Sequence, residues 1–428
     1  MRNGTWSLAL ILVTVTVFAS AQTSPPAQQQ SQEDRIKALE ERIIALEGQV
    51  RTLKVQQPQP APAATPATPE VTPAVPVSAQ AAGTAVGGGA ELAGQVPAYG
   101  GASAAAAKVL NPDISVIGDF LGSMGHNRFS PTPTFEMHES EVGFQAIIDP
   151  YARGDFFLSF GEQGVNLEEG YITFTALPAG LVLRGGKMRA AFGKVNTLHN
   201  HVLPWTDRPL VTNSLVGGED GINDAGLSLT RILPAPKGLF LEATGQVFRG
   251  DSDELFKSSR RSDVSTVAHL RGYRDLTEST NIDIGLSYAR GHNELGSGFL
   301  TQLYGADATV RWKPLRRSIY HSFVGRGEFI WSPRQQLPRL QRSFGMYTSG
   351  DYQLGRRWFV GARYDRSDRA QEAELTDSGG SLVLTYWPSE FSQIRGQYRL
   401  TRYAEHFDAH ELLMQLQFSL GAHGAHPF

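Results

Sequence analysis

From Asn111 onward, apolar and polar residues alternate with a period of two, and this alternation limits the fold more than any other feature of the chain. The clearest case is the last segment, where every second residue is large and apolar: Leu412, Met414, Leu416, Phe418 and Leu420. The residues between them include Gln415, Gln417 and Ser419. Period two places the two sets on opposite faces of a β-strand. The sequence therefore predicts an all-β fold whose strands each have one apolar face.

We count sixteen such segments, which begin near residues 113, 136, 153, 167, 181, 225, 239, 264, 280, 300, 319, 343, 358, 379, 393 and 412. Seven connections are tight, at 149–152, 177–180, 233–238, 275–279, 313–318, 354–357 and 388–392. The other eight are longer or more polar, around 122–135, 161–166, 194–224, 250–263, 291–299, 332–342, 366–378 and 403–411. Short turns at one end and long loops at the other are typical of an outer-membrane barrel. We expect a sixteen-stranded antiparallel transmembrane β-barrel over residues 110–421, with a tail at 422–428.

Other β folds fit the pattern less well. A soluble, exported β-sandwich would turn its apolar faces inward and would not need alternating short and long connections. A 22-stranded transporter with a plug needs more than the roughly 310 residues available for the barrel. Trp312, Trp358 and Trp387 lie beside short turns, where the aromatic girdle of a membrane interface is expected.

Residues 1–21 have the features of a cleaved signal peptide. Arg2 supplies a positive charge, an apolar stretch follows, and Ala19-Ser20-Ala21 fits a cleavage site before Gln22. The alternative, a buried N-terminal helix, is disfavoured because the polar, proline- and glutamine-rich sequence that follows has little apolar surface to pack around it. Export through this signal predicts a location in the outer membrane of the Gram-negative type.

Residues 33–55 carry three heptads of a coiled coil, with apolar residues at the a and d positions: Ile36, Leu39, Ile43, Leu46, Val50 and Leu53. The β-branched residues at a and leucine at d favour a dimer. Against this, residues 35–40 and 42–47 both fit Arg-h-x-x-h-Glu, where h is apolar, which resembles a trimer-specifying motif of short coiled coils. A single amphipathic helix packed on its own chain is a further alternative.

The segment 56–109 joins the coiled coil to the barrel. It is dominated by proline, alanine, glycine, threonine and glutamine, with seven prolines between Pro58 and Pro76. Such a composition favours extended, partly flexible chain and buries too little apolar surface to fold. We expect a flexible linker without chemistry of its own.

The composition and the motifs exclude several classes of function. The 428-residue chain has no cysteine, which excludes disulfides, thiolate metal sites and a cysteine nucleophile. A net charge of −3 argues against nucleic acid as a partner. The sequence shows none of the serine-hydrolase, zinc-protease or phosphate-loop motifs, so we predict neither an enzyme nor a bound cofactor.

The third long connection, 194–224, contains two histidines. His199 and His201 would bind a metal ion if a carboxylate such as Asp207 joined them. Loop histidines are more often solvated, so we predict no metal site here.

The charged residues that the alternation turns inward differ in sign along the chain. Glu139, Glu141, Asp155 and Glu169 face inward from early strands, and Arg363, Arg395 and Arg399 from late ones. The third long connection carries four acids: Asp207, Glu219, Asp220 and Asp224. Opposed acidic and basic walls would create a transverse field across a constriction of a water-filled lumen. A random scatter of charges in a wide, wet lumen is the alternative.

Two segments of the chain are similar to segments of a known protein family. Residues Asn111 to Phe120 (NPDISVIGDF) open the barrel, and Gly185 to Gly193 (GGKMRAAFG) lead into the third long connection. With the signal peptide, coiled coil and linker, they make the chain resemble a trimeric outer-membrane porin, most closely the phosphate-selective porins and relatives with an N-terminal coiled coil. The barrel has only five lysines, so a lysine-rich phosphate pathway is not evident.

The resemblance implies a function. It implies a homotrimer in outer-membrane lipid through which small hydrophilic solutes or ions diffuse passively, with the third long connection folded into the lumen. The coiled coil would reach towards peptidoglycan. The alternative function is a structural tether between the outer membrane and the cell wall, with a closed barrel.

The heptads give a first testable prediction. Because the resemblance to trimeric porins favours the trimer over the dimer, a peptide of residues 33–55 is expected to sediment at three times its monomer mass. Ile43→Asn should disperse it, because a polar group at a central a position lowers stability. Sedimentation of the unmodified peptide as a dimer in the analytical ultracentrifuge would contradict the trimer for this segment.

Overall fold

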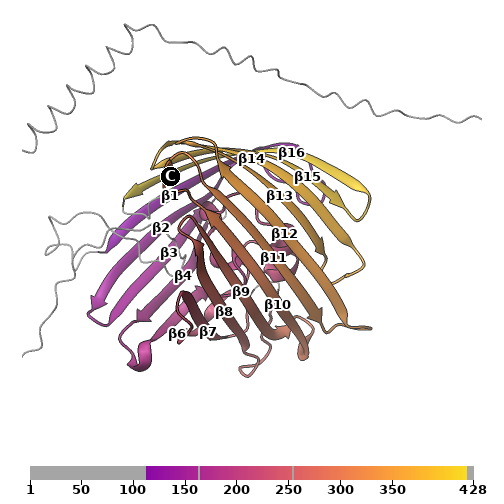
Figure 1. Cartoon of the computed structure of the whole chain (residues 1–428). Helices are drawn as coiled ribbons and strands as arrows, with labels where there is room; N and C mark the ends of the chain where they lie inside the picture. Colours follow the sequence, from indigo (N-terminus) through magenta and orange to yellow (C-terminus); the bar gives the residue numbers. More distant parts are fainter. Residues whose placement is uncertain (1–111, 162–163, 253–254, 422–428) are drawn as a thin grey trace, which may run out of the picture. The chain divides into compact units, whose positions relative to one another are not determined.

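In the computed structural model, which describes residues 112–161, 164–252 and 255–421, the alternating segments form sixteen antiparallel strands of one closed barrel (Figure 1). Each strand pairs with its neighbours in sequence, and β1 pairs with β16. The strands are β1 (Asp113–His126), β2 (Phe135–Asp149), β3 (Ala152–Gly161), β4 (Gly164–Phe174), β5 (Leu181–Arg189), β6 (Asn223–Leu233), β7 (Leu239–Phe248), β8 (Ser265–Thr277), β9 (Thr280–Asn293), β10 (Gly296–Trp312), β11 (Phe323–Arg334), β12 (Gln341–Gln353), β13 (Trp358–Asp368), β14 (Thr376–Ser389), β15 (Ser392–Tyr403) and β16 (Phe407–Gly421).

The predicted sixteen-stranded antiparallel barrel is confirmed. The inferred strand starts differ from the observed ones by at most five residues, the largest difference being at β16, which begins at Phe407 rather than near residue 412. The proposed signal peptide, coiled coil, linker and C-terminal tail, together with residues 110 and 111, lie outside the described residues.

The seam between the first and last strands closes the barrel. β1 and β16 are in register from Ser115, opposite Gly421, to His126, opposite His410. Gly118 lies opposite Phe418, and a Cβ atom at position 118 would overlap the Phe418 ring. Glycine at this position therefore lets the aromatic ring lie flat across the seam, which explains one residue of the segment that opens the barrel.

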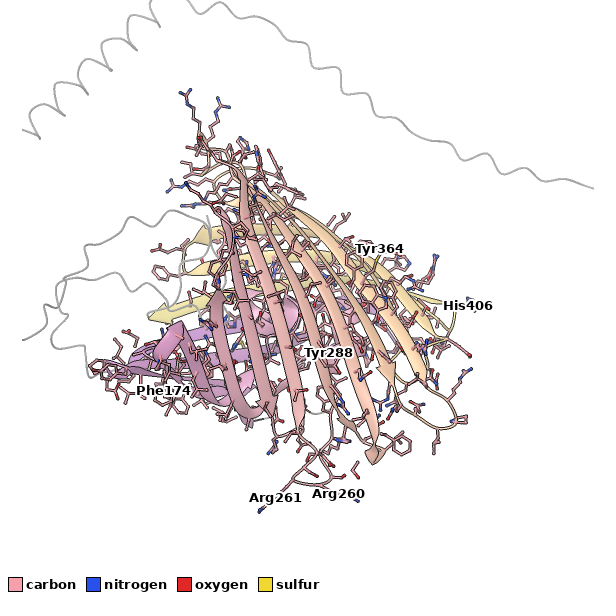
Figure 2. The ribbon with its side chains drawn as sticks, turned by 60° about the horizontal axis from the view of Figure 1, so that its bottom comes forward. Phe174, Arg260, Arg261, Tyr288, Tyr364 and His406 are labelled. Carbon is pink, nitrogen blue, oxygen red and sulfur yellow. The ribbon has the colours of Figure 1, made fainter. Side chains whose placement is uncertain are left out.

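The barrel is apolar outside and polar inside. Large apolar side chains such as Leu384 and Leu416 are exposed on the outer wall, where the rings of Tyr288 and Tyr364 also lie (Figure 2). The alternate residues, such as Thr385 and Gln415, point inward and are buried. A continuous apolar surface of this extent is unusual for a protein in water and is expected for a barrel wall that contacts hydrocarbon.

The connections differ in length from the expected pattern at several places: the expected tight turn at 313–318 is a longer connection, 313–322, and the expected long connection at 403–411 is a short one, 404–406. The two longest join β5 to β6 (residues 190–222) and β7 to β8 (residues 249–264), both at the end opposite the two terminal strand ends. At this same end, β9 stops at Asn293 and β10 starts at Gly296, so the expected long connection at 291–299 is wrong. The reason is that backbone pairing continues beyond the alternating apolar stretch, which takes most of this segment into the sheet.

Helical structure is confined to single turns in the described part of the chain. One turn, η1 (Pro178–Gly180), lies between β4 and β5. Three more, η2 (Val195–Thr197), η3 (Asn200–Val202) and η4 (Thr212–Gly217), lie between β5 and β6. None of these described helical turns has the length and apolar character needed to cross a membrane.

The outer wall gives a second prediction. Leu384 lies near the middle of β14 and is exposed on the apolar face. If this face contacts lipid, Leu384→Arg should lower the free energy of unfolding in bilayers by about 2–4 kcal/mol, because the charge would enter hydrocarbon. Leu384→Ala serves as the control and should cost less. Equal stability of the arginine variant and the unmodified protein in urea titrations would show that this face meets water.

Candidate functional site

The connection between β5 and β6, residues 190–222, folds into the barrel, and we call it the lumen loop. The Gly193 N–H donates to Ser287 Oγ of β9 at 2.9 Å, and the Leu210 N–H donates to Asp365 Oδ1 of β13 at 3.2 Å. The Thr206 N–H donates to Gln397 Oε1 of β15 at 2.9 Å. These partners lie on β9, β13 and β15, whereas the loop starts at β5 and ends at β6, so the loop crosses the lumen.

One face of the lumen loop is apolar and packs against the inner wall. Its buried side chains include Phe192, Val195, Leu203, Trp205, Val211, Leu215 and Ile222. They meet inward-facing apolar side chains of β7 to β12, namely Phe248, Val267, Ala289, Leu303, Ile330 and Tyr347. Each fully buried large side chain contributes about 1.5–3 kcal/mol relative to an exposed one. The loop is therefore held as a packed part of the barrel interior.

This internal core was not predicted from the sequence. The prediction considered the outward apolar face of each strand and not the apolar residues on the inward face. Leu303, Ile330 and Tyr347 are inward residues of adjacent strands and interrupt the polar lining. Apolar residues on the polar face of neighbouring strands are the signal that would have shown where the loop packs.

A buried ionic cluster fixes the middle of the loop to the late strands. Asp207 Oδ2 lies 2.9 Å from Arg363 on β13 and 2.9 Å from Arg399 on β15. Each arginine also pairs with an acid of the barrel wall, Arg363 with Asp365 at 2.6 Å and Arg399 with Glu411 at 2.8 Å. Burial raises the pKa of Asp207, but the two guanidinium groups outweigh it and hold that pKa below its ordinary value.

Arg395, the third arginine of the predicted basic wall, also binds the loop. It donates to the carbonyl oxygen of Trp205 at 3.0 Å and to Gln415 Oε1 at 2.7 Å. The Trp205 ring packs on Tyr347 with a centroid separation of 5.2 Å, and the Arg363 guanidinium lies 4.8 Å from that same indole. All three arginines thus anchor one segment of the loop.

This geometry corrects the expected transverse field. We expected Asp207 to face Arg363 and Arg399 across a water-filled aperture, whereas the three groups are in direct contact. The physical reason is that a buried arginine is costly without a partner, so the loop supplies the carboxylate to the wall instead of standing opposite it.

The other predicted acids of the loop have different surroundings. Glu219 accepts a hydrogen bond from Asn200 and lies 2.9 Å from His138 Nε2 of β2, and its carboxylate is half exposed. The Asp220 carbonyl oxygen accepts a hydrogen bond from Arg189 at 2.9 Å. Asp224 belongs to β6 rather than to the loop: its Oδ2 accepts from the backbone N–H groups of residues 250 and 251 and fixes the next long connection.

The early strands hold an acidic wall against the start of the loop. Glu139 and Glu141 of β2 and Glu169 of β4 face inward as predicted, as does Asp155 of β3, which pairs with Arg153. Glu139 lies 3.3 Å from the Asn200 amide. Glu169 accepts from the backbone N–H of Arg189 at 2.6 Å, where the lumen loop begins.

A β-bulge adds a carboxylate that the alternation did not predict. The register of β3 and β4 shifts between Phe157 and Leu158, and Glu168 is the additional residue on β4. Glu168 and Glu169 are consecutive in the chain, yet both are buried. A bulge turns one extra side chain to the same face, which strict period-two reasoning excludes.

His199 lies among these acids rather than in solvent. Its Nδ1 is 2.5 Å from Glu141 Oε2 and 2.9 Å from Glu168 Oε2, and its Nε2 is 2.9 Å from Glu169 Oε2. Burial lowers the pKa of His199, but the three carboxylates outweigh it and raise that pKa well above its ordinary value. Asp207, the carboxylate that we expected to join His199 and His201, is instead bound to the arginines.

Two cavities lie beside the loop. One, of about 170 Å³, separates it from the wall formed by β1, β2 and β16, and we call it the passage. Its lining includes Ser123, Glu136 and His138 from the wall and Asp207, Arg208 and Glu219 from the loop. A second cavity, of about 700 Å³, is lined by η4, by Leu255 and by Arg334 and Arg369.

Comparison by sequence does not assign the chain to a family. No family model matches the chain. An uncharacterized protein of Aquifex aeolicus is 26% identical over 349 residues, which cover 72% of this chain and 73% of that protein.

Several solved structures are similar despite low identity. An anion-selective porin from Comamonas acidovorans has a TM-score of 0.53 at 10% identity, and the match covers 72% of this chain and 99% of the porin. OprB of Pseudomonas putida, in a high-pH structure, has a TM-score of 0.51 at 8% identity, covering 72% and 94%. A loop-deletion mutant of OmpT, an outer membrane protein of Vibrio cholerae, has a TM-score of 0.50 at 8% identity, covering 72% and 99%. The chain therefore shares its barrel fold with these outer-membrane proteins.

The ionic cluster gives a third prediction. Asp207→Ala should lower the free energy of unfolding by roughly 1.5–3 kcal/mol, because charge-assisted hydrogen bonds to two buried arginines are lost. Because the pKa of Asp207 is lowered in the folded protein, its contribution is present above the ordinary aspartate pKa of about 3.9 and is lost as the pH falls below it.

The matched control is Asp408→Ala, which removes an exposed partner of Arg402 on β16 and should leave stability unchanged. Indistinguishable urea midpoints for the two variants would contradict the anchoring role of Asp207.

Proposed function

We propose that the protein is an outer-membrane porin through which small hydrophilic solutes or ions diffuse passively, in a water-filled barrel narrowed by the lumen loop. The observation that carries this proposal is the position of the loop. It is fixed to the late strands by Asp207 and to the inner wall by its apolar face, and it leaves the passage along β1, β2 and β16. A barrel filled on one side, with polar groups along the other, suits water-soluble solutes.

The charges that line the passage are mixed. Glu136, Asp207 and Glu219 contribute acids, and Arg208 and Arg399 contribute cations. A mixed lining favours general diffusion over strong preference for one sign of charge. Among the described residues that line the passage there is no lysine. The resemblance to phosphate-selective porins therefore supports the architecture more than phosphate as the substrate.

Location and assembly are part of the same proposal. The apolar outer wall supports insertion into a lipid bilayer, and a cleaved signal peptide at 1–21 would export the chain to the outer membrane. The heptads at 33–55 and the resemblance to trimeric porins support a homotrimer. With an even number of strands, both ends of the barrel lie on one side, from which the linker would carry the coiled coil towards peptidoglycan.

Conduction gives the fourth prediction. The unmodified protein in a planar bilayer should open discrete ion-conducting steps. Deleting residues 203–217 should increase the single-channel conductance, because this removes the segment that carries Trp205, Asp207 and Leu215 and fills the lumen.

A matched deletion of residues 258–261, in the connection between β7 and β8, is the control. This segment is mostly exposed, and its Arg260 and Arg261 lie at the tip of the connection (Figure 2). Its removal should leave conductance unchanged. A correctly folded protein that conducts no ions would contradict the porin and support the closed-barrel tether. Equal conductance of both deletion variants and the unmodified protein would show that the lumen loop does not narrow the pore.

A further inference from the structure

Two histidines of the lumen loop and two glutamates of the barrel wall converge on one small volume. His199 and His201 come from the segment around η3, Glu141 from β2 and Glu168 from β4. Ligand atoms of Glu141, His199 and His201 all lie within 4.8 Å of one another. Glu168 Oε2 lies 2.9 Å from His199 Nδ1, which places it in the same group. These atoms belong to three segments far apart in the sequence.

The contacts of His199 point to a ligand between these groups. Nδ1 faces two carboxylate oxygens, Glu141 Oε2 at 2.5 Å and Glu168 Oε2 at 2.9 Å, while His201 Nδ1 lies 3.6 Å from Glu141 Oε2. A ring nitrogen carries at most one proton and can direct it at one acceptor. In a tetrahedral site with bonds of about 2.0–2.1 Å, ligand atoms lie about 3.3 Å apart. The observed separations of 2.5, 2.9 and 3.6 Å lie on both sides of that spacing.

Glu169 gives His199 the outer partner typical of a metal-bound histidine. His199 Nε2 lies 2.9 Å from Glu169 Oε2. In metal sites, the ring nitrogen that does not bind the ion donates its proton to a carboxylate, which fixes the tautomer and the ring orientation. This tautomer turns the lone pair of Nδ1 towards the oxygens of Glu141 and Glu168. Such an arrangement is repulsive unless a metal ion, or a second ring proton, lies between them.

The side chain of Glu168 offers a buried carboxylate oxygen to an ion. It is 4% exposed, and its Oε2 atom accepts no hydrogen bond of regular geometry from the described residues. The Arg189 guanidinium is 3.5 Å away, which is longer than a hydrogen bond. This buried oxygen needs a donor, which is His199 Nδ1 if that nitrogen is protonated, and a directly bound cation would satisfy it equally.

We propose that Glu141, Glu168, His199 and His201 form a binding site for one divalent transition-metal ion, with Glu169 as the outer partner of His199. Two imidazole nitrogens and two carboxylate oxygens are a ligand set suited to Zn²⁺, whereas Ca²⁺ and Mg²⁺ prefer oxygen alone. The ion would tie the segment around η3 to β2 and β4, across the β1–β16 seam from the arginine cluster. The site does not depend on conduction through the barrel.

The test is calorimetric titration of the untagged, metal-stripped full chain in detergent with zinc chloride. We expect one Zn²⁺ per chain. His201→Ala and Glu141→Gln should each weaken binding by at least 10-fold, and Glu169→Gln should weaken it by about 10–100-fold through the outer partner. The control is His138→Ala. This histidine lies on β2, outside the proposed site, and pairs with Glu219. It should bind Zn²⁺ like the unmodified protein.

X-ray absorption of the zinc-loaded, unmodified protein keeps the test valid even where a variant fails to fold. The spectrum should show a first shell of nitrogen and oxygen at about 2.0–2.1 Å with the outer-shell scattering of two imidazoles. The proposal is overturned by absence of stoichiometric binding, by a zinc shell without imidazole, or by folded Glu141 and His201 variants that bind zinc as tightly as the control. In those cases His199 carries a second proton on Nδ1, which faces the two carboxylates in place of a metal ion. A protein that conducts ions but does not bind zinc contradicts only the metal site. A protein that binds zinc but does not conduct contradicts only the porin function.

Discussion

Closure of the sheet is the constraint on which the rest of this structure depends. A strand edge left unpaired in hydrocarbon exposes a row of backbone N–H and C=O groups, each costing several kcal/mol. Pairing of β1 with β16 leaves none of the sixteen described strands with a free edge. Closure also divides the side chains into two populations, an apolar one on the outer wall and a mostly polar one that faces the lumen. Charged groups of the strands are then forced into the lumen, where each needs water or a partner.

The lumen loop supplies many of those partners. It contacts the barrel through charge at two places, the Asp207 cluster on the late strands and the His199 cluster on the early strands, with an apolar core between them. These attachments act on different parts of one loop, so together they fix its path across the lumen. The cavity beside β1, β2 and β16 that we call the passage lies between this path and the barrel wall.

Two β-bulges place side chains that a regular strand would turn outward. On β4, Glu168 is the additional residue at the register shift opposite Phe157 and Leu158. On β2, the shift opposite Asp119 and Phe120 makes His138 the additional residue, which contacts Glu219 of the loop. In both cases two consecutive residues reach the lumen. The bulges thus concentrate titratable groups where the loop meets the early strands.

The sequence by itself determined the number of strands, their approximate starts and the inward direction of residues such as Glu141, Arg363 and Arg395. Each of these depends on local alternation, which a strand expresses without reference to its neighbours. The partners of those residues depended on the tertiary structure. Asp207 and Arg363 are 156 positions apart in the chain, and no local pattern relates them. The same holds for His199 and the bulged Glu168, because a bulge is set by the register of two strands and a loop path by the wall against which it packs.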